Sequence, residues 1–211
     1  PLIHYGKGVF IEGILRRVKA VDICVKHVER VGVPKRSHKL SLSLDDSLTE
    51  EAVRKPINIG DNGELFKGFN AKDGLGISCA LRSGLKVAII TGRKSEIIHK
   101  RSAELGITLL CEGVKDKYAE LIKLTKELAL TKEEVAYMGD DLNDLPAFRA
   151  AGFSFAPQDA VTEVVNNADC VVQKDGGRGA VRAAIEMILK AQDKWEGLIA
   201  SYLLSGQGDK Q

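Results

Sequence analysis

The feature that most constrains the fold is a regular alternation of short, wholly apolar runs with amphipathic stretches between residues 57 and 192. Residues 87–90 and 135–138 are two such runs. A continuous apolar run is typical of a strand that is buried on both faces, and the stretches between the runs have helical spacing. Strands that alternate with helices in this way predict an α/β, Rossmann-like fold, in which helices cover both faces of a parallel sheet.

The expected elements follow one another along this part of the chain. A hairpin is expected at 57–69, because the Asn62-Gly63 pair favours the positive φ angles of a type I′ turn. The expected helices cover residues 75–83, 94–105, 117–130, 145–151, 160–165 and 179–192. The expected strands cover residues 87–90, 107–110, 135–138, 153–156 and 169–172.

The first quarter of the chain follows this pattern less well. Leucines and serines alternate at 40–44, which predicts a half-buried strand rather than a central one. Upstream, residues 18–31 have a spacing that allows a helix. We therefore divide the chain into an N-terminal segment (1–56), a core (57–192) and a C-terminal tail (193–211).

Composition excludes several classes of protein. The formal net charge of +2 over 211 residues gives no reason to expect nucleic acid or a membrane surface as a partner. No apolar run approaches the ~18 residues of a membrane span, and no signal-peptide pattern is present. The cysteines form no C-x-x-C pair, which favours reduced thiols and a cytoplasmic location; they are Cys24, Cys79, Cys111 and Cys170.

Three carboxylates follow the apolar run at 135–138. Asp140, Asp141 and Asp144 lie within five residues, and their mutual repulsion favours a bound cation. Carboxylates, together with water and substrate phosphate, are what Mg²⁺ prefers. The alternative is a solvated turn in which Asp144 caps the helix that follows.

A hydroxyl and two cations follow other predicted strands. Thr91, with Gly92 and Arg93 after it, ends the run at 87–90 and could hold a phosphate oxygen at a helix start. Lys117 begins the helix expected at 117–130 and could neutralise phosphate charge. The alternatives are that Thr91 caps the helix expected from residue 94 and that Lys117 is solvated.

Five segments, in this order, strongly resemble a known family. They are IGDNGELFKGFN (59–70), KDGLGI (72–77), IITGR (89–93), VAYMGDDLND (135–144) and GGRGAV (176–181). The resemblance is to the phosphatases of 3-deoxy-D-manno-octulosonate 8-phosphate, which form a capless class of the haloacid dehalogenase-like superfamily. It covers about residues 57–191.

The resemblance implies Mg²⁺-dependent hydrolysis of a sugar-acid phosphate, in lipopolysaccharide precursor synthesis, by a homotetramer to which the hairpin contributes. An aspartate would be phosphorylated and then hydrolysed, with Thr91 and Lys117 binding the phosphoryl group. Asp140 would bind Mg²⁺, with Asp141 and Asp144 beside it. The implied substrate-binding residues are Asp73, Gly74, Gly92, Arg93, Arg101 and Arg178.

The family's first motif, D-x-D-G-x-x-x-D-G, is not matched before residue 57. The nearest candidates for its catalytic aspartates are Asp45 and Asp46, whereas an ungapped count from Gly60 reaches Ser47. Three explanations stay open: an out-of-frame segment, caused by a frameshift or a sequencing error; a non-catalytic relative; or catalysis by Asp45 and Asp46 in an altered geometry.

Other functions also stay open. A non-catalytic binding or oligomerisation module would keep the Asp140 cluster without turnover. A phosphatase for nine-carbon, sialic-acid-type phosphates resembles the chain too, but those relatives carry Glu at the position of Arg93 and Lys at that of Glu104. A receiver domain is disfavoured, because it has no role for the cluster that follows Lys117.

Overall fold

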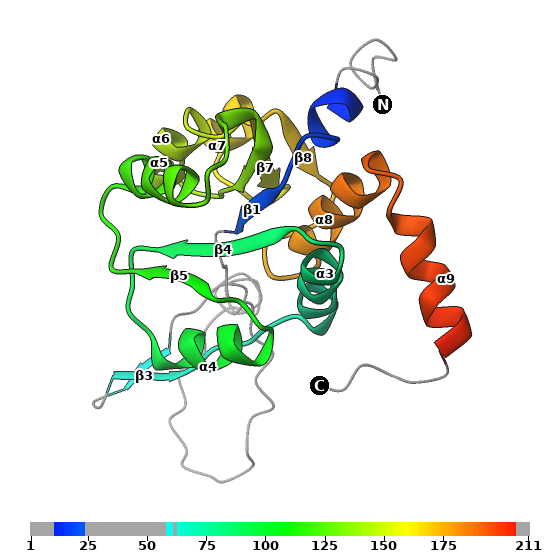
Figure 1. Cartoon of the computed structure of the whole chain (residues 1–211). Coiled ribbons are helices and arrows are strands. Elements are labelled where there is room, and N and C mark those ends of the chain that lie inside the picture. Colours follow the sequence, from blue (N-terminus) through cyan, green and yellow to red (C-terminus); the bar gives the residue numbers. More distant parts are fainter. Residues whose placement is uncertain (1–10, 24–57, 61–62, 206–211) are drawn as a thin grey trace, which may run out of the picture.

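The computed structural model describes residues 11–23, 58–60 and 63–205. A six-stranded parallel sheet forms its centre, in the order β5-β4-β1-β6-β7-β8 (Figure 1). Its strands are β1 (Ala20–Ile23), β4 (Lys86–Thr91), β5 (Leu109–Glu112), β6 (Val135–Met138), β7 (Phe153–Pro157) and β8 (Cys170–Val172). The sheet confirms the predicted α/β, Rossmann-like fold.

Every helix and strand predicted after residue 70 is present, with bounds that differ by a few residues. The helices are α3 (Ala71–Arg82), α4 (Glu96–Glu104), α5 (Lys117–Glu127), α6 (Leu145–Phe148), α7 (Thr162–Asn167), α8 (Ala180–Ala191) and α9 (Trp195–Ser205). Two 3-10 helices, η1 (Lys132–Glu134) and η2 (Leu142–Asp144), flank β6. Helix α9 occupies much of the stretch that the sequence left as a tail.

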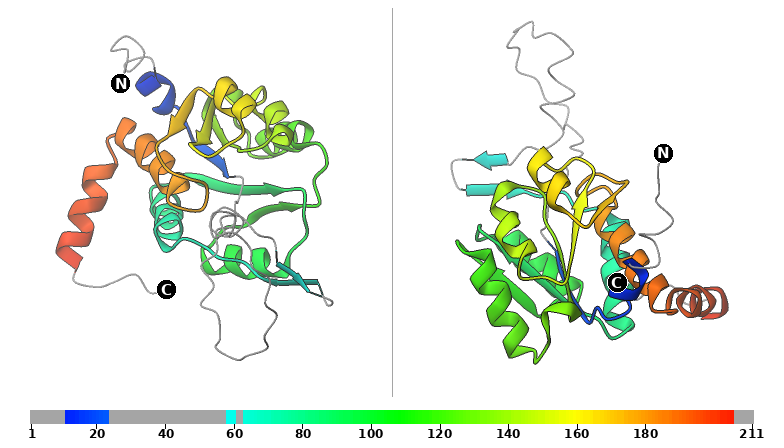
Figure 2. Two further views of the ribbon diagram at one scale, coloured as in Figure 1. Left: turned by 180° about the vertical axis from the view of Figure 1, so that it is seen from behind. Right: turned by 90° about the horizontal axis from the view of Figure 1, so that it is seen from above.

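Alternating side chains divide the core into two layers, one on each face of the sheet. Val87 and Ile89 of β4 pack in the layer beneath α3 and α8, whereas Ala88 and Ile90 pack in the layer beneath α5 and α6. Seen from above, the sheet lies between these two groups of helices (Figure 2). A strand with both faces buried explains why its sequence is apolar throughout.

The central strand comes from the part of the chain that fits the sequence pattern least. β1 pairs with β4 on one side and β6 on the other, and Asp22 lies opposite Ala88 and Tyr137. The helix that the spacing allowed over 18–31 is therefore wrong at 20–23, because two neighbouring strands supply backbone partners there. The strand predicted at 40–44 lies outside the described residues.

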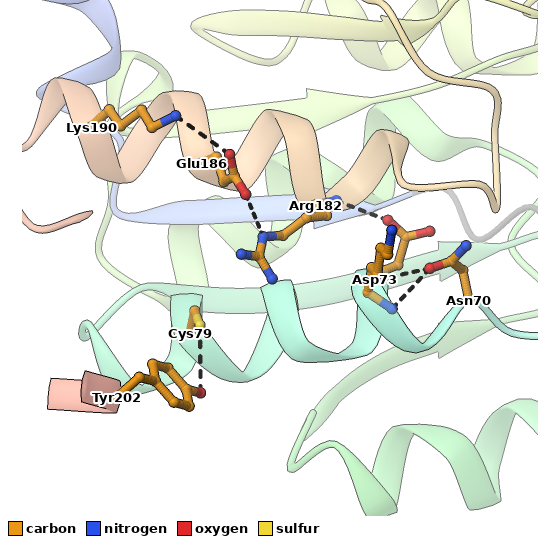
Figure 3. Close-up of polar contacts among 8 residues, drawn as sticks. Asn70, Asp73, Cys79, Arg182, Glu186, Lys190 and Tyr202 are labelled. Atoms are coloured by element: carbon orange, nitrogen blue, oxygen red, sulfur yellow. Dashed lines mark hydrogen bonds and ion pairs between the residues drawn. The ribbon is translucent and has the colours of Figure 1, made fainter. Parts of the chain in front are cut away.

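Helices α3 and α8 are joined by a buried carboxylate. Asp73, in the first turn of α3, accepts hydrogen bonds from the backbone N–H groups of Gly179 (3.1 Å) and Arg182 (2.9 Å) at the start of α8. Figure 3 shows the contact with Arg182. A Cβ on Gly76 would lie 3.1 Å from the Cα of Arg182, so a glycine permits this close approach. The contact holds the segment that precedes α8 against α3.

A two-stranded hairpin precedes α3, as predicted from the Asn-Gly pair. β2 (Asn58–Gly60) pairs antiparallel with β3 (Gly63–Phe66), and the hairpin projects from the body of the domain (Figure 1). Residues 61 and 62 of its turn lie outside the described residues. The hairpin forms a sheet of its own and adds no strand to the central one.

Two further expectations concern the environment of the protein. Cys79, Cys111 and Cys170 are free thiols, in agreement with the predicted reduced cysteines, while Cys24 lies outside the described residues. Within the described part of the chain, none of the helices has the length and apolar character needed to cross a lipid bilayer.

Asp73→Asn is expected to change how the free energy of unfolding depends on pH. Burial raises the pKa of Asp73, although hydrogen bonds from the start of α8 oppose the shift. As pH rises through the ordinary value of ~3.9, the unfolded state loses the Asp73 proton before the folded state does. The wild type should therefore lose stability relative to Asp73→Asn until the raised pKa is passed. Urea unfolding across this pH range measures the difference, and a difference that does not change with pH would contradict the prediction.

Candidate active site

Three of the predicted site residues come together at the carboxyl edge of the sheet, and Asp22 lies within the neighbouring strand β1. Asp22 lies near the end of β1, Thr91 ends β4, and Asp140 follows β6. Lys117 begins α5, shortly after β5 ends. The carboxyl ends of neighbouring parallel strands share one edge, and ligands of open α/β sheets bind there. The fold thus brings together Thr91, Lys117 and Asp140 from the predicted set and adds Asp22.

Asp22 lies within the sheet rather than on the surface. Its side chain is 2% exposed, and the alternation along β1 places it on the opposite face from Val21. Burial raises the pKa of the nearby Cys111 thiol to about 12, with Glu120 and Asp22 adding to the rise. Cys111 is therefore a protonated neighbour at neutral pH and not a competing nucleophile.

Asp144 is the centre of a buried polar network. Its Oδ1 accepts hydrogen bonds from Lys117 Nζ (2.5 Å) and from the Tyr137 hydroxyl (2.7 Å). Its Oδ2 accepts the backbone N–H groups of Asp140 (3.0 Å) and Asp141 (3.2 Å). Asp144 is 0% exposed and Lys117 is 5% exposed, so the solvated alternative for Lys117 is wrong.

This network gives Asp144 a structural role that the sequence did not predict. Its carboxylate accepts four hydrogen bonds below the surface and positions Lys117 and the backbone of Asp140, while its place beside Mg²⁺ stays a prediction. Its side chain does not cap α6, although Asp144 precedes that helix. A Cβ on Gly139 would lie 2.3 Å from the Cβ of Asp144, so only glycine allows the carboxylate to sit here.

The other two acidic residues of the motif differ in exposure. Asp141 is exposed, and its carboxylate accepts the backbone N–H of Leu142 (2.7 Å) to cap η2. Asp140 is 6% exposed and lines a cavity at the carboxyl edge of the sheet. Of the three predicted metal ligands, Asp140 is the one whose position suits an ion.

Asp140 supplies a carboxylate that fits Mg²⁺. It follows β6 at the edge where phosphate ligands bind, whereas Asp22, on the adjacent strand β1, lies opposite Tyr137, three positions earlier. Mg²⁺ is commonly held in proteins by one or two carboxylates, with waters and substrate phosphate oxygens completing its octahedron.

The turn after β4 is held in place from β5. The Thr91 hydroxyl accepts the backbone N–H of Arg93 (3.2 Å), whereas Ser95 caps α4 by accepting from Ile98 (3.3 Å). Glu112 of β5 accepts the backbone N–H of Ser95 (2.9 Å) and pairs with His99 (2.6 Å). Thr91 is therefore not the cap of α4, and the alternative that its hydroxyl only caps that helix is wrong.

Three of the predicted substrate-binding residues, Asp73, Gly74 and Arg101, line a cavity of about 60 Å³ beside Asp140. Arg101 lines it, pairs with Glu104 (3.0 Å) and lies over the Phe69 ring at 5.8 Å. A Cβ on Gly74 would lie 2.5 Å from the guanidinium of Arg101, so Gly74 makes room for that side chain.

The remaining predicted residues are placed differently. Asp73 lines the same cavity, and its carboxylate also binds the start of α8; its role as a substrate ligand stays a prediction. Gly92, Arg93 and Arg178 are exposed on loops that follow β4 and β8. Asp45 and Asp46 lie outside the described residues.

Comparison with known proteins decides the family. The pattern of haloacid dehalogenase-like hydrolases matches residues 110–185. The 3-deoxy-D-manno-octulosonate 8-phosphate phosphatase KdsC of Escherichia coli K12 is 47% identical over 138 residues, which are 65% of this chain and 73% of that protein. The chain belongs to the 3-deoxy-D-manno-octulosonate 8-phosphate phosphatase family.

Solved structures of the family share this fold. One, from Moraxella catarrhalis, is a complex with a magnesium ion, a phosphate ion and a KDO molecule; it is 33% identical, has a TM-score of 0.76, and the match covers 92% of this chain and 99% of that one. A cobalt-bound form from Haemophilus influenzae is 35% identical, with a TM-score of 0.74 and coverage of 90% and 99%.

Asp22 is the residue that sequence reasoning missed. In this family the first motif, D-x-D-G, ends the first strand, and in the structure Asp22 stands near the end of the central strand. The residues from Asp22 onward are Asp22-Ile23-Cys24-Val25, which share one aspartate with that motif. The available signal was an acidic residue directly after the short apolar pair Ala20-Val21, which the helical spacing at 18–31 obscured.

Lys117→Met and Asp144→Asn are each expected to lower the free energy of unfolding by about 3–5 kcal/mol, because each leaves a buried partner uncompensated. The double variant should lose clearly less than the sum of the two, since neither charge then remains. Urea unfolding of the four proteins completes the cycle. Additive losses would show that the two charges do not depend on each other.

Proposed function

We propose that the chain is a Mg²⁺-dependent phosphatase that hydrolyses 3-deoxy-D-manno-octulosonate 8-phosphate to the free sugar acid and phosphate. The observation that carries the proposal is the meeting of Thr91, Lys117 and Asp140 at the carboxyl edge of a family fold, with Asp22 in the central strand between β4 and β6. It is supported by the Moraxella catarrhalis relative, whose structure holds a magnesium ion, a phosphate ion and KDO.

Asp22 is the nucleophile in this proposal. Its carboxylate oxygen attacks phosphorus and the bond between phosphorus and the sugar oxygen breaks, so an aspartyl phosphate forms. The departing sugar oxygen takes a proton from solvent water. Water then attacks that phosphorus and releases inorganic phosphate, which regenerates the Asp22 carboxylate. The Thr91 hydroxyl and the Lys117 ammonium hold the phosphoryl oxygens, where negative charge must be neutralised.

Asp22 and Asp140 would hold the Mg²⁺ ion. When bound, the ion supplies positive charge beside the phosphoryl oxygens and lowers the repulsion that an anionic nucleophile meets there. Asp144 contributes from below by fixing Lys117 and the backbone of Asp140. The exposed Asp141 caps η2 and is not assigned to the ion.

The eight-carbon sugar acid is the proposed substrate because Arg93 stands where the nine-carbon relatives carry Glu. Arg101, beside the cavity, and Arg178, on the loop before α8, are the proposed partners of the sugar-acid carboxylate. A guanidinium suits this role because it can bind both carboxylate oxygens at once. A phosphatase for a nine-carbon substrate is the alternative, and the same assay with that substrate separates the two.

A second candidate function rests on position 24. The family uses the second aspartate of its first motif as general acid and base, and this chain has Cys24 there. Without that group, the departing sugar oxygen and the attacking water lack their proton partner. The chain would then bind substrate and accept a phosphoryl group on Asp22 but release phosphate slowly.

Assembly and location remain predictions. A homotetramer is supported by the projecting hairpin and by the strongly exposed Leu203 and Leu204 of α9, which a neighbouring subunit could cover. The reduced cysteines agree with the predicted cytoplasmic location.

Purified protein is expected to release inorganic phosphate from 3-deoxy-D-manno-octulosonate 8-phosphate with Mg²⁺ and not with a chelator. Asp22→Asn should abolish release, because an amide cannot form the acyl phosphate. Asp45→Asn and Asp46→Asn are compared in the same assay. Loss of release in either of these, with Asp22→Asn active, would return the nucleophile to that segment, and no release from folded wild type would refute turnover.

Cys24→Asp is expected to raise steady-state phosphate release by about 100-fold or more, the usual contribution of a positioned general acid and base. Wild type should instead release phosphate slowly, and intact-mass spectrometry detects the aspartyl phosphate that accumulates. Cys24→Ser is the control, since a hydroxyl does not replace a carboxylic acid. Equal rates for the three proteins would remove position 24 from the mechanism.

A further inference from the structure

Tyr137 is a wholly buried polar residue next to the proposed nucleophile. It lies on β6, is 0% exposed, and is the Cα partner of Asp22 in the register between β1 and β6. Its ring belongs to the core layer beneath α5 and α6, where it meets Phe148 edge to face at 6.0 Å. Nothing in the proposed chemistry requires a phenol at this position.

The hydroxyl of Tyr137 determines how Asp144 is held. It donates to Oδ1 (2.7 Å), the same oxygen that accepts Lys117 Nζ (2.5 Å). The other oxygen receives two backbone N–H groups, so each carboxylate oxygen has two donors. The four donors, from α5, from β6 and from the turn after β6, fix the orientation of the Asp144 carboxylate. Lys117 in turn is positioned by its contact with Asp144.

We propose that Tyr137 is a positioning residue that acts through Asp144 to aim the Lys117 ammonium at the phosphoryl group. The inference rests on the proposed function, in which Lys117 binds that group. An ammonium has three N–H donors. Oδ1 of Asp144 accepts one hydrogen bond from the Tyr137 hydroxyl and one from Lys117. Lys117 therefore gives Oδ1 a single N–H, and in the proposal its other N–H groups are directed at the phosphoryl group.

A purely structural role for the hydroxyl makes a different prediction. A phenol that only satisfies a buried carboxylate would, on removal, lower stability and leave phosphate affinity unchanged. A phenol that orients the pair would also weaken the binding of orthophosphate, the product that Lys117 contacts. Orthophosphate affinity therefore separates the two roles without requiring turnover.

The test compares Tyr137→Phe with Tyr202→Phe. Both remove one hydrogen-bonded hydroxyl and keep the ring. Tyr202 lies on α9, on the other face of the sheet, where its hydroxyl contacts Arg82 and Cys79 (3.9 Å to Sγ) (Figure 3). Both variants should stay folded, with melting temperatures lowered by similar amounts.

Calorimetry of orthophosphate binding in Mg²⁺ is the first readout. Tyr137→Phe is expected to weaken binding about tenfold, the scale of one lost hydrogen bond to a charged group, and Tyr202→Phe to leave it unchanged. Where the wild type turns over, kcat of Tyr137→Phe should fall by a similar factor. In an Asp144→Asn background, adding Tyr137→Phe should have little further effect, because the residue acts through Asp144.

The possible outcomes are distinct. Unchanged orthophosphate affinity in folded Tyr137→Phe would overturn the inference. It would also be overturned if Tyr137→Phe lowered the affinity of Asp144→Asn by the same factor as it lowers that of the wild type. Orthophosphate binding without phosphate release in the wild type would refute turnover but leave the role of Tyr137 measurable. A wild type that binds no orthophosphate would overturn both proposals.

If Tyr137→Phe does not fold, the wild type is tested by ¹⁵N NMR spectra of Lys117, recorded in solution or with magic-angle spinning. An Nζ signal that orthophosphate leaves unchanged would overturn the inference.

Discussion

The structure depends on one buried negative charge. Removing a carboxylate from water costs several kcal/mol unless donors replace the lost hydration. Asp144 obtains those donors from α5, from β6 and from two backbone N–H groups. Gly139 contributes by lacking a Cβ, which would collide with the Asp144 side chain. The same interaction therefore joins the sheet to α5, folds the turn after β6, and presents Lys117 and Asp140 at the edge where a phosphate ester would bind.

On the other face of the sheet, a second buried carboxylate joins α3 to α8. There, α3 and α8 approach each other closely at Gly76, and the Asp73 carboxylate satisfies backbone N–H groups at the start of α8. This contact holds the loop that carries Arg178 and the glycines lining the cavity. Two buried carboxylates therefore position the site. Asp144 fixes Lys117 and the backbone of Asp140, and Asp73 fixes the loop that carries Arg178; neither role requires contact with the substrate.

Prediction from sequence succeeded where local pattern and tertiary environment agree. β6 was expected at 135–138 and is found there, because a strand buried on both faces must be apolar throughout. The hairpin and α8 were found for similar local reasons. The structural roles of Asp144 and Asp73 were not predicted, since an acidic residue that faces an ion and one that faces backbone donors look alike in sequence. Asp22 was missed because its strand is only four residues long and its spacing also allowed a helix.

The sequence alone determined the α/β fold and the order of its elements after residue 57, and it singled out Thr91, Lys117 and Asp140, which the fold brings to one edge of the sheet. Period and residue type are enough for these, because each depends on neighbours along the chain. Only the tertiary structure decided that Asp22 occupies the central strand, that Lys117 is buried, and that Asp144 and Asp73 hold the fold together. Those facts depend on which distant groups meet: β1 is defined by its partners β4 and β6, and a buried charge is defined by the donors that surround it.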